Sequence, residues 1–293
     1  MYSEIEKNKL KTLFILVGFF VLVAGLAGLA TLYFGNRSVF VYTMIGSAVY
    51  ALISYFASAR MALALNGAKE ISKQDSPELW RTIENLTIAN GMPMPKVYIM
   101  EEKGLNAFAT GRNPDNSSVA ITTGLLEVLD KKELEGVMAH ELGHIKNYDI
   151  RVSLMAFAAV GVISLLCDFF LRVSWYSGGL TDDDDSAKTF AIFGIVAAII
   201  APIVATMLQL ALSRRREYLA DASGALTTRY PEGLANALRK IQAYGSTVKR
   251  QNSSTAHLFI ANPLKGGFFS SLFSTHPPID ERIARLEKMG SQL

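Results

Sequence analysis

Cysteine is almost absent from this sequence, and its net charge is small. The 293 residues include one cysteine, Cys167, which excludes an intrachain disulfide and a cysteine-rich metal cluster. The formal net charge is only +3, and the lysines and arginines do not gather with aromatic residues into a stripe that could follow a phosphate backbone. We therefore expect no nucleic-acid partner.

Charge is also missing from four long apolar stretches, in a chain of which half the residues are hydrophobic. The stretches are residues 12–36, 38–59, 152–167 and 189–213. A helix rises 1.5 Å per residue, so the longer stretches can cross a hydrocarbon core of about 30 Å. We expect four transmembrane helices in two hairpins, an N-terminal hairpin at residues 1–59 and a second at residues 152–213. The second hairpin either crosses the membrane fully or partly covers the polar domain.

Basic residues indicate how these helices are oriented. They gather near the ends of the stretches on one side: Lys7, Lys9, Lys11, Arg60, Lys69, Arg151 and Arg214 to Arg216. Because cytoplasmic loops are enriched in lysine and arginine, both termini and the polar segments should face the cytoplasm. The opposite side carries the acidic run Asp182 to Asp185, which lacks the spacing of a calcium loop and is expected to be a solvated turn. The first apolar run is too long for a signal peptide and is expected to remain as an anchor.

The two polar segments, residues 60–151 and 214–293, have the pattern of a folded α+β domain. Ser76-Pro77-Glu78 predicts a helix start and Gly91 its end, and three strands are expected at residues 96–100, 105–110 and 118–122. Asp130 with Glu133 three residues later predicts a capping box. The helix that follows has apolar residues at helical spacing on one face: Leu134, Val137, Met138, Leu142 and Ile145.

This helix carries a metal-binding pattern, His140-Glu141-Leu142-Gly143-His144. Residues four apart lie on the same helical face, so both imidazoles can reach one ion, while Glu141 can contact a bound water and take its proton. The alternative is that both histidines are structural residues of an ordinary amphipathic helix and bind no metal.

A zinc site with catalytic function needs a third protein ligand and an open position. Glu217 follows the fourth apolar stretch, and Asp221 lies one turn further along the same expected helix. Glu217 could bind the ion while Asp221 accepts a hydrogen bond from a ligand imidazole. Without the histidine motif, the two carboxylates would be interpreted as a solvated pair at a helix start.

Four segments together resemble one family. His140 to Asp149 resembles the extended HExxH motif of HtpX-type membrane zinc metalloproteases, relatives of the CAAX prenyl endopeptidases. Glu217 to Asp221 is similar to the family's ExxxD segment, Asn106 to Gly111 to its NAFATG segment, and Thr275 to Pro278 to its THPP segment. The similarity extends from one end of the chain to the other.

The resemblance implies a gluzincin-like metalloendopeptidase with a zincin-like, predominantly helical domain and one Zn²⁺ per chain. Its implied site residues are His140, His144 and Glu217 as zinc ligands, Glu141 as general base, His276 as donor to the oxyanion, Asp221, Asp149 and Asn147 as supports of the ligands, and Asn106, Ala107, Phe108 and Ala109 as substrate-binding residues on an exposed edge strand. Expected substrates are unfolded or misassembled membrane proteins in the bacterial cytoplasmic (inner) membrane, with self-cleavage conceivable and the oligomeric state open.

Two other classes of protein could carry this metal-binding pattern. A zinc-binding channel or transporter would usually carry ionisable residues inside its membrane helices, and these stretches are nearly free of them. An inactive relative would usually lack the base or a ligand, whereas Glu141, His140, His144 and Glu217 are all present. The sequence therefore favours the active enzyme.

Overall fold

The structure, a computed structural model, describes residues 2–156, 158–159, 161, 214–245, 258–261 and 277–291. The chain divides into two compact units. The first comprises Met1–Lys9, Ser58–Leu154 and Leu212–Leu293, and the second Leu10–Ala57 and Met155–Ala211. The expected fourth apolar helix and His276 lie outside the described residues, and only the first residues of the third helix lie within them.

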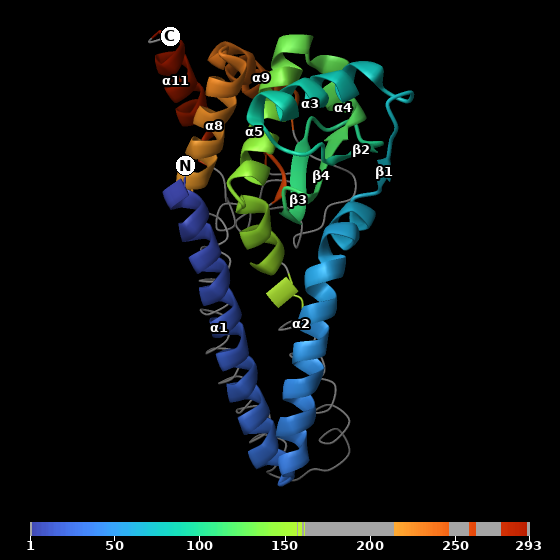
Figure 1. Ribbon diagram of the computed structural model, residues 1–293, viewed down its shortest axis with the longest axis vertical. Coiled ribbons are helices and arrows are strands. Elements are labelled where there is room, and N and C mark those ends of the chain that lie inside the picture. The colour runs from blue at the N-terminus through green and yellow to red at the C-terminus, as the bar shows by residue number, and fades with distance from the viewer. Residues whose placement is uncertain are drawn as a thin grey trace, which may run out of the picture. The chain divides into compact units, whose positions relative to one another are not determined.

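Two long apolar helices contribute most of the described second unit. Helix α1 covers Tyr2–Phe34 and helix α2 covers Arg37–Leu65, and they run in opposite directions from a tight turn (Figure 1). Gly35 in that turn has φ 65°, a left-handed conformation that glycine adopts without a steric penalty. Within the described residues, Glu6–Gly28 and Arg37–Leu65 are long and apolar enough to cross a membrane. Two of the four expected membrane helices are therefore present as helices of sufficient length.

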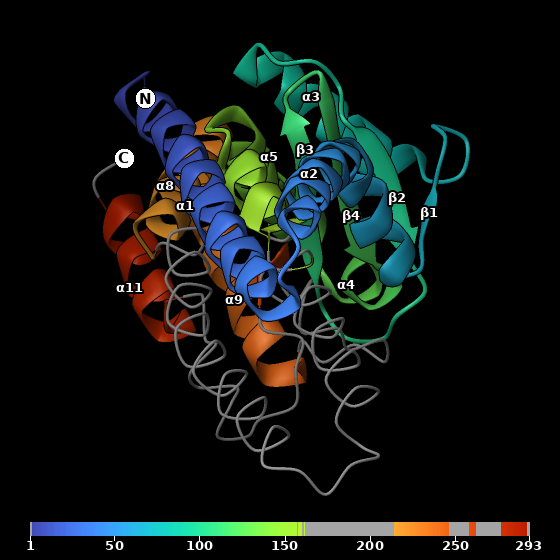
Figure 2. The same ribbon diagram turned by 90° about the horizontal axis from the view of Figure 1, so that it is seen from below.

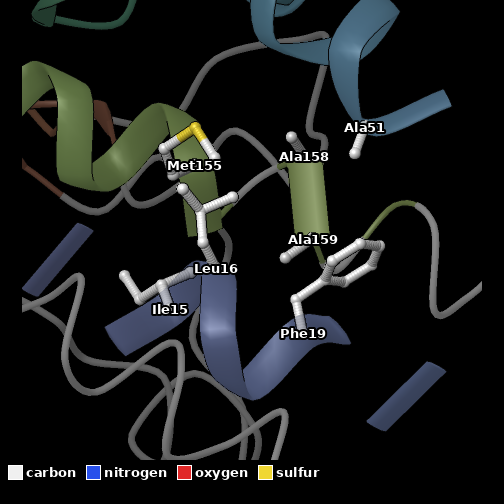
Figure 3. A pocket seen from close by; sticks show the side chains of 7 residues that line it. All are labelled: Ile15, Leu16, Phe19, Ala51, Met155, Ala158 and Ala159. Carbon is white, nitrogen blue, oxygen red and sulfur yellow. The ribbon is translucent and has the colours of Figure 1, made fainter. Parts of the chain in front are cut away.

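A small cavity lies among the apolar side chains of this second unit (Figure 3). It is lined by Ile15, Leu16, Phe19, Ala51, Met155, Ala158 and Ala159. Its volume is about 10 Å³, close to the minimum that holds one water molecule, and its lining side chains are all apolar. The cavity is a packing gap and too small for a ligand.

A four-stranded sheet lies in the first unit. Its strands are β1 (Ala68–Glu70), β2 (Lys96–Met100), β3 (Ala107–Asn113) and β4 (Asn116–Thr122), in the order β1-β2-β4-β3. Strands β2 and β4 are parallel, and the other two pairs are antiparallel. The three expected strands are confirmed, although β3 begins at Ala107 rather than Leu105. The order makes β3 an edge strand.

Among the described residues of the first unit, six helices accompany the sheet: α3 (Pro77–Asn90), α4 (Thr123–Val128), α5 (Lys131–Lys146), α8 (Arg214–Thr228), α9 (Pro231–Tyr244) and α11 (Ile279–Gly290). Helix α3 begins with Pro77 and ends at Gly91, which has φ 61°, as its sequence predicts. The capping box of α5 is present, because Asp130 accepts from the backbone N–H of Glu133 at 2.9 Å and Glu133 accepts from that of Asp130 at 2.8 Å.

Helix α5 lies between the sheet and helices α8 and α9 (Figures 1 and 2). Its five expected apolar residues are all buried in the main core, together with apolar residues of α3, β4 and α9. Burying each large aliphatic side chain contributes about 1.5–3 kcal/mol. The helix that carries the HExxH motif is thus packed on several sides, which fixes the direction of its polar residues.

Candidate metal centre

The two histidines of α5 lie one turn apart and point to the same place. Their ring centroids are 4.7 Å apart, and 3.2 Å separates the two Nε2 atoms. The His140 side chain is fully buried, whereas 15% of the His144 side chain is exposed. The site is therefore reachable from the His144 side.

Glu217 of α8 completes a group of three potential metal ligands. Its Oε2 lies 3.8 Å from His140 Nε2, and its Oε1 lies 3.5 Å from His144 Nε2. The three ligand atoms all lie within 4.8 Å of one another. Sequence placed the two histidines together, and the structure brings Glu217 to them from a distant part of the chain.

This donor set fits a tetrahedral zinc ion. With bonds of about 2.0–2.1 Å, neighbouring donors of a tetrahedral site lie roughly 3.3 Å apart. The two imidazole nitrogens are 3.2 Å apart, and each has one oxygen of the Glu217 carboxylate within 3.8 Å. Two imidazole nitrogens and one carboxylate are also a ligand set found at catalytic zinc, where a water or substrate takes the fourth position.

Small residues allow α5 and α8 to approach closely, and the two helices lie side by side (Figures 1 and 2). A Cβ added at Gly224 of α8 would lie 3.1 Å from the backbone nitrogen of His140. A Cβ added at Gly143 of α5 would lie 3.4 Å from the Cα of Ala220. This close contact sets the distance between Glu217 and the two imidazoles.

Each histidine has a carboxylate oxygen at its second ring nitrogen, Nδ1, on the side away from Nε2. Asp221 Oδ1 lies 2.9 Å from His140 Nδ1, and Asp149 Oδ2 lies 3.0 Å from His144 Nδ1. A carboxylate at Nδ1 keeps the proton on that nitrogen, so that Nε2 presents its lone pair to a metal. Both predicted supports are therefore in contact with the histidines.

Asn147, the third predicted support, lies differently. It is 1% exposed, and its backbone N–H caps α5 by donating to Gly143 O at 3.0 Å. Its side-chain amide makes no hydrogen bond within the described part of the chain. Asn147 shapes the end of the helix through its backbone.

Arg282 of α11 is a site residue that no sequence motif predicted. It is fully buried, and it donates from Nε to Asp221 Oδ2 at 2.9 Å and from Nη2 to Asp221 Oδ1 at 2.7 Å. Its Nη1 lies 3.9 Å from Glu217 Oε2. One signal could have found it: Arg282 shares a helical face with Ile279, Ile283 and Leu286, where an unpaired charge would be costly.

Glu141 is placed to act as a base. It is 1% exposed, and burial raises its pKa to about 7, against the opposing effect of His144. The backbone N–H of Ala109 in β3 also bonds to its carboxylate and favours the charged form. A carboxylate with a pKa near neutrality is suited to accept and return a proton.

The two histidines differ in their affinity for protons. Burial lowers the pKa of His140 to about 4, so its imidazole is neutral at neutral pH. Burial acts in the same direction on His144, but the Glu217 and Asp149 carboxylates outweigh it and raise the pKa of His144 to about 9. A metal ion must therefore displace a proton from His144.

The predicted substrate strand is at the sheet edge but is not exposed, and this expectation was wrong. Asn106 to Thr110 are all at most 5% exposed. The segment Leu258–Ala261 lies along their outer edge, where Ile260 N–H donates to Ala107 O at 2.9 Å and Phe259 forms a bridge with Phe108. The Asn106 side chain also donates to Ala261 O at 2.9 Å. The strand reaches the metal centre at Ala109, beside Glu141.

The fold and this cluster define a metallopeptidase, and comparison with known proteins places it in a family. Residues 73–290 match the profile of Peptidase family M48, and the chain belongs to this family. It is 51% identical over 292 residues to a "Protease HtpX homolog" of Tropheryma whipplei (strain TW08/27), with 100% of this chain and 99% of that protein covered. A protein of the same name from Ligilactobacillus salivarius (strain UCC118) is 43% identical, with 99% and 100% covered.

A solved structure supports the fold. The crystal structure of S. mikatae Ste24p matches with a TM-score of 0.54 and 18% sequence identity, covering 98% of this chain and 67% of that chain. At this identity the likeness shows the fold alone. The profile match and the relatives confirm the family expected from the motifs: the protein is an HtpX-type membrane protease of family M48.

Proposed function

We propose that the protein is a zinc-dependent endopeptidase that hydrolyses misfolded or damaged membrane proteins during stress. The observation that carries the proposal is the cluster of His140, His144 and Glu217, whose donor atoms lie within 4.8 Å of one another next to the buried Glu141. Membership of family M48 supports the peptidase activity, and the donor geometry supports zinc.

The proposed architecture is a zincin-like domain formed by residues 60–151 and 214–293. The proposed membrane hairpins are residues 1–59 and 152–213. Helices α1 and α2 support the first hairpin, since both are long and apolar enough to cross a membrane. The distribution of lysine and arginine supports a multi-pass protein of the bacterial inner membrane with its metal centre facing the cytoplasm.

In this proposal His140, His144 and Glu217 hold the ion. Zinc, when bound, lowers the pKa of a water molecule and polarises a carbonyl group. Asp221 and Asp149 keep the protons of His140 and His144 on Nδ1. The Glu141 carboxylate takes the proton of the attacking water and returns it to the leaving amine nitrogen, for which its pKa of about 7 is suitable.

We propose that the substrate backbone lies along β3, in the part of the edge nearest Glu141. Backbone pairing gives affinity with little sequence selectivity, which suits unfolded membrane proteins and would also permit self-cleavage. Asn106, Ala107 and Phe108 contact the chain's own segment Leu258–Ala261, so Ala109 is the best placed of the four predicted residues to meet substrate. His276 is proposed to donate to the oxyanion of the tetrahedral intermediate.

Substitution of the base and of the ligands tests the mechanism, because their tasks differ. In Glu141→Gln the three ligands remain, so zinc should stay bound at one ion per chain while cleavage of an unfolded substrate falls about a hundredfold or more. In His144→Ala and Glu217→Ala a ligand is lost, so zinc content and cleavage should fall together.

Zinc stoichiometry is measured by elemental analysis of the full chain in detergent, beside the cleavage rate. A chelator should abolish wild-type activity, and added zinc should restore it. Cleavage by Glu141→Gln at the wild-type rate would refute the role of the base, and active wild-type protein without bound metal would refute the zinc mechanism.

A further inference from the structure

The first residues of α1 belong to the same unit as the metal centre, although α1 continues into the first apolar stretch. Asn8 is 2% exposed. Its Nδ2 donates to Asn147 O at 2.8 Å and to Asp149 Oδ1 at 2.8 Å. A side-chain amide carries two hydrogens, so each of these acceptors receives one.

Asp149 links Asn8 to a metal-ligating histidine. While its Oδ1 accepts from Asn8, its Oδ2 lies 3.0 Å from His144 Nδ1. The carboxylate is 3% exposed, and Arg216 Nη1 lies 3.8 Å from Oδ1. A buried carboxylate needs donors on both oxygens, and these donors fix its rotation. The direction of Oδ2 toward His144 therefore depends on what holds Oδ1.

The backbone between the two acceptors is in an unusual conformation. Tyr148 has φ 61°, in the left-handed region that residues other than glycine rarely adopt, and such a residue persists only where its surroundings hold it. Asn8 bonds to the residue before Tyr148 and to the residue after it. Lys9 Nζ also lies 5.7 Å from the centre of the Tyr148 ring. The start of α1 thus contacts the whole turn that follows the HExxH helix.

We propose that Asn8 is a positioning residue of the metal centre. Through its bonds to Asn147 O and Asp149 Oδ1, it orients Asp149 so that Oδ2 accepts the Nδ1 proton of His144 and leaves Nε2 directed at the ion. The inference rests on the proposed zinc function. It assigns a part in metal binding to a residue that precedes the first apolar stretch, residues 12–36, in addition to the orientation that the neighbouring lysines indicate.

The chemistry of the two bonds explains why an asparagine suits this position. Serine carries one hydrogen and could satisfy only one acceptor, and alanine carries none. Aspartate would place a second carboxylate against Asp149 and would repel it. Metal affinity should therefore decrease in the order Asn, Ser, Ala and Asp at position 8.

The test measures the zinc dissociation constant of the full chain in detergent, by competition with a chelator of known affinity. Asn8→Ala should raise this constant about tenfold or more, the effect usual for a group that orients a metal ligand. It should also lower kcat at saturating zinc and leave KM unchanged. Asn66→Ala is the matched control, because Asn66 is also a buried asparagine of the first unit, and its side chain donates to Ala62 O at the end of α2. The control should bind zinc within about twofold of wild type.

A double-mutant cycle shows whether Asn8 acts through Asp149. In an Asp149→Ala background, Asn8→Ala should have no further effect on the zinc constant, whereas independent effects would add. An undiminished effect in that background overturns the proposal, as does an Asn8→Ala constant within about twofold of wild type. A lower unfolding midpoint of the metal-free variant with unchanged zinc affinity also overturns it.

Asn8→Ser covers the case in which Asn8→Ala does not fold. The zinc dissociation constant of Asn8→Ser should lie between those of wild type and Asn8→Ala. If Asn8→Ala does not fold, the constant of Asn8→Ser should still be measurably higher than that of wild type. A wild-type value contradicts the inference. The outcomes for the proposed function are separate. If the wild type binds zinc but cleaves no peptide, the proposed endopeptidase function is refuted. The ratios of the zinc dissociation constants still test the role of Asn8.

Discussion

Replacing Arg282 by methionine removes a buried cation from the ion pair that supports His140. In the structure the guanidinium is fully buried and donates to both oxygens of Asp221, at 2.9 and 2.7 Å. Breaking a buried pair by removing one partner costs about 3–5 kcal/mol, because the other charge stays buried without compensation. At about 2–4 °C per kcal/mol, the unfolding midpoint should fall by roughly 6–20 °C.

The assay is thermal unfolding of the full chain in detergent, with metal removed so that zinc binding does not contribute. Arg285→Met is the matched control on the same helix. Arg285 is exposed and lies over the Tyr218 ring at 3.6 Å from its centroid, an interaction of about 0.5–1 kcal/mol at exposed sites. The control should therefore shift the midpoint by only a few degrees.

A second variant separates stability from metal binding. When Arg282→Met is combined with Asp221→Leu, the carboxylate that both guanidinium bonds held is removed as well, and the midpoint should recover most of its loss. Zinc affinity should stay about 10–100-fold weaker, because His140 has lost the carboxylate at Nδ1. A midpoint for Arg282→Met within about 2 °C of wild type, or wild-type zinc affinity in the double variant, would refute this account of the pair.

Two further changes test the helix contact and the membrane topology. Gly224→Val adds a branched side chain that begins 3.1 Å from the His140 backbone, so it should separate α8 from α5 and lower zinc content. At Gly46, nothing in the described part of the chain lies within 4 Å of an added Cβ, so Gly46→Val should leave zinc content unchanged. Equal zinc content in the two variants would contradict the argument that Gly224 sets the distance between the helices. In a Cys167→Ala background, a cysteine at Lys131 should react with reagents only from the cytoplasm and one at Asp183 only from outside. Labelling of both positions from the cytoplasm would contradict the second hairpin.

Local geometry explains which features the sequence predicted well. The spacing of His140 and His144 puts them on one helical face whatever surrounds the helix, because 3.6 residues complete a turn. The capping box likewise depends on two side chains only three residues apart, Asp130 and Glu133. The apolar runs of α1 and α2 needed no tertiary information to be identified as long apolar helices.

The sequence by itself therefore determined the two imidazoles, their helix and the apolar helices, while the tertiary structure decided what surrounds the site. Contacts between distant segments depend on how helices and loops pack, which no local pattern encodes. Glu217 meets the histidines because glycine and alanine let α8 approach α5, and Arg282 is buried because α11 packs against α8 and α9. The covering of β3 by Leu258–Ala261 and the contact of Asn8 with Asp149 join residues more than a hundred positions apart, so neither has a periodicity from which it could be predicted.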